Sequence, residues 1–277
     1  MPSNREIDEL SRRYYNVSEL LRMGWIIFKA NIGPILIITA CIYLPLCIVE
    51  QLIQQNADVI QNSLNFTNLL SSREMLIEFF SSETGKSWIM LSFINTFLEM
   101  VFAPLVIVAI AKLAQSFIYD KDTSNPGKFV AFALSKIHWV IICNIICKAL
   151  IMLGFVAFII PGILFLIIFY FVNYAISLSD RRGLSSLKHS LLLSRGRKFR
   201  IFAYGIAFFL MSFVIEYFVG YAFAASVNQF SSMVLMKYIL GVNKAFFTIP
   251  IAIWYLNMEF TAMIRPYSDE TVLDDDE

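Results

Sequence analysis

The sequence predicts an all-α, polytopic integral membrane protein with six transmembrane helices and additional amphipathic helices at the membrane interface. Two observations support this fold class. Of the 277 residues, 58% are hydrophobic and only 16% are charged, whereas soluble domains carry about a quarter charged residues. The apolar residues also gather into runs of the length, about 20 residues, that a helix needs to cross a bilayer. A soluble helical core does not need runs so long and so free of charge.

The apolar runs divide the chain into a polar head, one membrane domain and an acidic tail. The head covers residues 1–15, the membrane domain 16–265 and the tail 266–277. Within the membrane domain, six spans are predicted at about residues 32–49, 88–118, 139–159, 163–178, 201–227 and 238–264.

The membrane domain begins with apolar residues at helical spacing over residues 16–30, which predicts an interfacial helix capped by Asn16 or Ser18. Trp25 in this helix suits the depth of the lipid headgroups. Pro45 lies inside the first span and is expected to kink it.

A long polar connection, residues 50–86, follows the first span. Its apolar residues are spaced like two short amphipathic helices, at about 52–64 and 75–80. A second interfacial helix is predicted at about residues 124–137, after the second span.

Residues 139–177 are apolar almost without interruption, which is too long for one crossing of about 30 Å at about 1.5 Å per residue. We therefore expect Pro161 and Gly162 to form a tight turn between the third and fourth spans.

The segment 179–200 is strongly basic and is predicted to form a third interfacial helix. Its apolar face would consist of Leu184, Leu187, Leu191 and Leu192. The basic residues either only enforce orientation or also bind anionic lipid. The candidate lipid contacts are Arg181, Arg182, Lys188, Arg195, Arg197 and Lys198.

The placement of lysine and arginine predicts the orientation, because basic loops stay on the cytoplasmic side. The basic segments before the first span, between the second and third, and between the fourth and fifth all fall on one side. Both termini are therefore expected in the cytoplasm, with the protein in a bacterial inner membrane. The pattern also suggests three units, each an interfacial helix followed by a helical hairpin.

Pro161-Gly162, followed by Leu187, Ser190, Leu191 or Leu192, and Gly196, resembles the membrane domain of the glycerophosphoryl diester phosphodiesterase family and related uncharacterised six-span bacterial proteins. The segment 20–31 is similar to the N-terminal helix of that family. The resemblance implies the fold and the membrane location. It does not imply phosphodiesterase activity, because no catalytic barrel accompanies the membrane part in this sequence.

The sequence carries no recognisable enzyme motif, and no enzymatic activity, metal or cofactor is expected. His138 and His189 are interpreted as interfacial polar residues and not as a catalytic pair. Cys143 and Cys147 share a helix face, but without a nearby histidine they favour packing over metal binding. The net charge of +1 gives no bulk attraction to nucleic acid.

Ionisable residues inside the predicted spans are the remaining candidates for function, because a charge at the bilayer centre costs about 2.5–3.5 kcal/mol. They either line a polar site or pair structurally, for example Lys148 with Glu216 or Glu99. The candidates are Glu99, Lys148, Glu216 and Glu259.

These features predict a non-enzymatic membrane protein that associates with lipids or supports membrane or envelope homeostasis. The alternative is a transporter or channel that uses the intramembrane charges. Membrane lipids are the expected partners, and a protein partner or self-association stays open.

Overall fold

The computed structural model describes residues 13–62, 77, 79, 81–119, 121–179, 183–224 and 230–264. This part of the chain is helical and contains no strand, and six of its helices are long and apolar enough to cross a membrane. The predicted fold class is therefore confirmed. The six candidate spans are Ile32–Asn56, Glu83–Ile118, Ile137–Ala157, Ile159–Leu178, Lys198–Phe223 and Phe230–Thr261.

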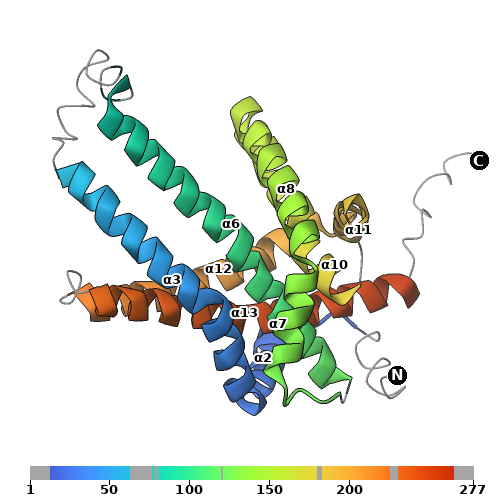
Figure 1. Cartoon of the computed structure of the whole chain (residues 1–277). Coiled ribbons are helices and arrows are strands. Elements are labelled where there is room, and N and C mark those ends of the chain that lie inside the picture. The colour runs from blue at the N-terminus through green and yellow to red at the C-terminus, as the bar shows by residue number, and fades with distance from the viewer. Residues whose placement is uncertain are drawn as a thin grey trace, which may run out of the picture.

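The long helices pack as three hairpins, and a short helix precedes each hairpin along the chain. The first unit consists of α2 (Val17–Ala30), α3 (Ile32–Asn62) and α6 (Glu83–Ile118). The second consists of α7 (Pro126–Ser135), α8 (Ile137–Ala157), α9 (Ile159–Phe169) and α10 (Val172–Leu178). The third consists of α11 (Leu184–Ser194), α12 (Lys198–Phe223) and α13 (Phe230–Ile264). The far ends of the hairpins diverge, and α2, α7 and α10 lie where the hairpins converge (Figure 1).

The helix α13 is the centre of this arrangement. It packs on α2, α3, α6 and α12, and 72% of its most apolar stretch is buried, against 11% for α12. Trp254 of α13 is fully buried and meets Phe171 edge-to-face, with 4.9 Å between the ring centroids. The first and third hairpins are therefore joined mainly through α13, the second hairpin packs mainly on α6, and α12 lies at the periphery.

A glycine allows α2 to lie directly against α13. A Cβ atom added at Gly24 would come within 2.9 Å of the Cδ atom of Pro250. That distance is shorter than a normal carbon contact, so a larger residue at Gly24 would push the two helices apart.

The first hairpin differs from the sequence prediction in its connection. The helix α3 continues to Asn62, so the first of the two predicted surface helices is the continuation of the first span. The second predicted helix, at about 75–80, lies mostly outside the described residues. Pro45 lies within α3, as expected.

The second hairpin turns earlier than predicted. The break is at Phe158, whose extended backbone (φ −162°, ψ 154°) separates α8 from α9. Pro161 and Gly162 instead belong to the first turn of α9, where proline is tolerated because its missing N–H would have no helical partner. A Cβ at Gly154 would lie 2.9 Å from the Cα of Gly162, so these glycines let the two helices approach closely beside the turn.

Asparagine side chains connect the helices across the core. Nδ2 of Asn144 on α8 donates a hydrogen bond of 3.0 Å to Oδ1 of Asn173 on α10. Nδ2 of Asn243 on α13 donates to Oγ of Ser212 on α12, at 2.9 Å. Such bonds between helices are a usual way to satisfy polar groups inside a membrane protein.

Candidate functional site

The short helix α2 begins at one of the two predicted N-cap positions. Asn16 occupies the N-cap position, and its backbone N–H donates a 2.9 Å hydrogen bond to the carboxylate of Glu19. This hydrogen bond, with a smaller contribution from Arg13, lowers the pKa of Glu19. Trp25 is half exposed, so α2 presents apolar surface outside the core.

The helix α11 turns its small polar residues toward the protein. Its inner side is formed mainly by serines, namely Ser186, Ser190 and Ser194 together with Leu193. Of the four leucines predicted to form the apolar face, Leu184, Leu191 and Leu192 are exposed and Leu187 is partly buried. Small residues let α11 lie close to α9 and α10, and Oγ of Ser190 donates a 2.6 Å hydrogen bond to the carbonyl of Ile168. Leu184, Leu191 and Leu192 therefore point away from the protein core, whereas Leu187 and Leu193 pack against it.

The predicted lipid-binding cations do not all lie in equivalent surroundings. Arg181 and Arg182 lie outside the described residues. Arg197 is partly buried and donates a 3.3 Å hydrogen bond to the carbonyl of Met258, which ties it to α13. The exposed members of the set are Lys188, Arg195 and Lys198. Together with the exposed leucines Leu184, Leu191 and Leu192 they form what we call the α11 surface.

The four predicted intramembrane residues do not form one site. Lys148 is exposed on α8 and makes no ion pair within the described part of the chain. The expected pairs of Lys148 with Glu99 or Glu216 are therefore absent there. Both glutamates lie instead near Lys244 of α13, with 3.9 Å between Nζ of Lys244 and Oε1 of Glu99.

A polar cluster around Lys244 is the intramembrane site that the sequence analysis missed. The Tyr43 hydroxyl accepts a hydrogen bond from Nζ of Lys244 at 3.5 Å. Nearby, Nζ of Lys237 lies 3.5 Å from Oε2 of Glu50, and both side chains are largely buried. Lys237 and Lys244 are seven residues apart, a spacing that puts them on one face of α13. That spacing was a signal in the sequence for a shared site.

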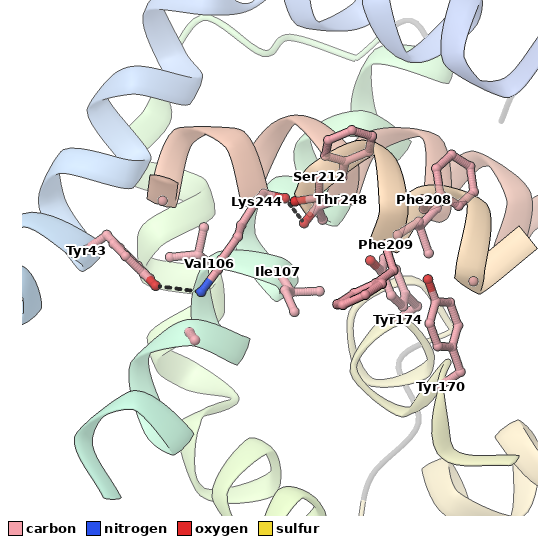
Figure 2. Close-up of a pocket in the computed structure, with 15 residues that line it drawn as sticks. Tyr43, Val106, Ile107, Tyr170, Tyr174, Phe208, Phe209, Ser212, Lys244 and Thr248 are labelled. Carbon is pink, nitrogen blue, oxygen red and sulfur yellow. Dashed lines mark hydrogen bonds between the residues drawn. The ribbon is translucent and has the colours of Figure 1, made fainter. Parts of the chain in front are cut away.

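A cavity of about 330 Å³ lies beside Lys244 (Figure 2). Residues of α3, α6, α10, α12 and α13 contribute to its wall, together with Tyr170, which follows α9. Lys244 and Tyr43 meet at one end, and Tyr170, Phe208 and Phe209 lie toward the other (Figure 2). The site therefore combines an aromatic and aliphatic wall with a single ammonium group.

Glu259 belongs to a different cluster, where α10, α11 and α13 meet. Its Oε1 accepts a 2.7 Å hydrogen bond from Oγ of Ser179, which is also 2.6 Å from the hydroxyl of Tyr255. Nε2 of His189 lies 3.1 Å from the same carboxylate oxygen, close enough for an ion pair when the imidazole is protonated, although the angle is not that of a hydrogen bond. This cluster joins α11 to the central helix.

The two histidines and the cysteines occupy separate surroundings. His138 lies beside Trp139 with 4.9 Å between the centroids of the tilted rings, whereas His189 faces Glu259. Cys143 and Cys147 are buried thiols without a disulfide. In the part of the chain that the structure describes, His, Cys, Asp and Glu side chains form no group able to hold a metal ion.

The geometry thus defines a six-helix membrane protein with interfacial helices and an intramembrane cavity. Residues 70–253, well over half of the chain, match the family described as a domain of unknown function, DUF7847. The protein belongs to this family. Comparison with curated proteins gave no match, and comparison with solved structures gave none either.

Proposed function

We propose that this protein is a non-enzymatic, lipid-associated protein of a bacterial cytoplasmic membrane that supports membrane or envelope homeostasis. Its α11 surface would bind anionic lipid headgroups on the cytoplasmic side. We also propose that the protein is related to the membrane domain of the glycerophosphoryl diester phosphodiesterase family.

The observation that carries the proposal is the packing of α11 through its serine side. Because its serines face the protein, leucines and cations share the outer side. A helix with exposed leucines beside lysine and arginine suits the boundary between headgroups and acyl chains. Each basic residue near an anionic surface contributes about 1 kcal/mol to its attraction.

Binding of phosphatidylglycerol and phosphatidylcholine to the purified full-length protein, followed by native mass spectrometry, tests the proposal. We expect tighter binding of phosphatidylglycerol and a loss of roughly 30-fold in the Lys188→Gln/Arg195→Gln variant, from about 1 kcal/mol per cation. The control is Lys86→Gln/Lys128→Gln, which removes two other exposed lysines. Equal binding of both lipids, or an unchanged affinity in the α11 variant, would contradict the proposal.

A second candidate function, a transporter or channel, is favoured by the Lys244 cluster. Charged groups inside a membrane often mark an ion or proton pathway. Proton and potassium flux in proteoliposomes would then change in Lys244→Met and Glu216→Gln. If the wild-type protein and both folded variants conduct neither ion, this candidate is rejected.

A further inference from the structure

The cavity beside Lys244 lies within the membrane-spanning helices, which limits what can enter it. Its wall is mainly apolar and includes Val106, Ile107, Phe208, Phe209, Phe247 and Ile251. Ligand sites of proteins have volumes of roughly 300–1,000 Å³, so a cavity of about 330 Å³ suits one small apolar group or chain. In a bilayer the acyl chains of lipids are the abundant molecules of this kind.

The hydroxyl groups in the wall near Lys244 already have partners. Oγ of Ser212 donates to the carboxylate of Glu216 at 3.0 Å. Oγ1 of Thr248 donates to the backbone carbonyl of Lys244 at 2.9 Å. The Tyr43 hydroxyl accepts from Lys244. Ser212 and Thr248 are therefore poor candidates for holding the polar end of a ligand, whereas Tyr43 keeps its O–H donor beside Lys244.

Lys244 also keeps donors available. An ammonium group has three N–H donors, and within the described residues its one hydrogen-bond partner is Tyr43. The 3.9 Å to Glu99 makes an ion pair but exceeds hydrogen-bond distance. An acceptor oxygen at the end of a chain in the cavity would accept a hydrogen bond from one of these available N–H donors.

The charges around Lys244 decide which acceptor fits. Three carboxyl groups lie near two lysine side chains in this cluster. The five residues, which interact electrostatically, are Glu50, Glu99, Glu216, Lys237 and Lys244. The cluster therefore holds more carboxyl groups than lysine side chains. A ligand carboxylate would add another negative charge in a medium of low dielectric constant, whereas an ester carbonyl would not.

We propose that this cavity binds one acyl chain of an uncharged ester lipid, whose carbonyl oxygen accepts a hydrogen bond from Nζ of Lys244. The site is separate from the α11 surface and binds its ligand by a different chemistry. Loss of anionic-lipid binding at α11 would therefore leave it intact.

Two substitutions on α12 distinguish binding in the cavity from adhesion to the outside of the helix. A Cβ at Gly205, in the cavity wall, would make ordinary contact with Tyr170 at 3.6 Å, so Gly205→Leu would extend into the cavity. Gly220 has nothing within 4 Å of the equivalent position, so Gly220→Leu is a matched control. Likewise, Lys148→Met controls for Lys244→Met, because Lys148 is an exposed lysine of another span.

The test is photolabelling of the full-length protein in nanodiscs with a monoacylglycerol that carries a diazirine in its chain. We expect labelling of cavity peptides, competition by monoolein in preference to oleic acid, and strong loss of labelling in Gly205→Leu. Lys244→Met should weaken binding by about tenfold or more, as expected for a hydrogen bond to a charged group. The two control variants should behave as wild type.

Labelling confined to other peptides, or unchanged cavity labelling in Gly205→Leu, would overturn the cavity site. Competition by oleic acid as strong as that by monoolein would overturn the choice of an uncharged ester. If Gly205→Leu fails to fold, the Lys244→Met variant and the two competitors decide the question.

Discussion

Lys244 and Glu99 belong to different hairpins of the protein, yet Nζ and Oε1 lie 3.9 Å apart beside the intramembrane cavity. Both side chains are about half exposed on helices predicted to span the membrane, where an unpaired charge would face lipid. Removing one partner leaves the other uncompensated, which costs more than the pair itself contributes.

Lys244→Met is therefore expected to destabilise the protein, and Glu99→Gln added to it is expected to recover part of the loss. A double-mutant cycle on thermal or chemical unfolding in detergent should give a coupling of about 0.5–3 kcal/mol. Strictly additive effects of the two substitutions would show that the pair does not contribute to stability.

Gly24→Leu is expected to destabilise the contact between α2 and α13. A Cβ at Gly24 would lie 2.9 Å from Pro250, and overpacking of this kind costs about 1–3 kcal/mol. The melting temperature of the detergent-solubilised protein reports the effect. Gly33→Leu is the control, because the space around its Cβ position is open. Similar melting temperatures for the two variants would argue against this packing.

The orientation of α11 predicts that substitutions on its two sides affect the stability of the protein differently. Ser190→Leu should destabilise the protein by about 1–3 kcal/mol, because Ser190 is fully buried and bonded to Ile168. Leu192→Ser should leave stability nearly unchanged, because that side chain is exposed. Unfolding of both variants in detergent tests this, and a larger loss in Leu192→Ser would mean that the leucine face is buried.

The connection between α6 and α7 carries a pH-sensitive contact. The hydroxyl of Ser124 (2.6 Å) and its backbone N–H (2.9 Å) donate to the carboxylate of Asp122 and lower its pKa. Because the folded pKa is depressed, the contact stabilises the connection above the unfolded pKa and is lost as the pH falls through the folded pKa.

Ser124→Ala should therefore raise the pKa of Asp122 toward its ordinary value. Carboxyl NMR of ¹³C-labelled aspartate in nanodiscs measures this change. Ser135→Ala removes another exposed hydroxyl, which bonds within α7 to Phe132, and should leave the pKa of Asp122 unchanged. An Asp122 pKa that is the same in wild type and Ser124→Ala would refute the role of Ser124.

The sequence was sufficient for the fold because the hydrocarbon thickness of a bilayer demands long apolar runs. The start of α2 at Asn16 was equally accessible, because capping residues act locally. The turn at Phe158 could not be predicted from the sequence, because a proline such as Pro161 disrupts the interior of a helix but fits its first turn. Sequence alone does not say which of these two positions the proline occupies.

The sites were harder to predict, because they depend on tertiary packing. Glu50 was assigned to a loop, whereas α3 continues past it and brings it to Lys237. The packing of the serine side of α11 on the protein was not predicted, because lipid and the protein interior favour the same apolar side chains. Hydrophobic periodicity therefore finds the faces of such a helix without telling which one meets the protein.

Cysteine accessibility tests the membrane placement on which both lipid sites depend. Glu83 at the start of α6 and Lys128 in α7 are exposed positions separated by one predicted span. We would introduce Glu83→Cys or Lys128→Cys after replacing the four native cysteines. A membrane-impermeant maleimide should label Glu83→Cys on intact cells and Lys128→Cys only after permeabilisation. Labelling of both positions on intact cells would contradict the account.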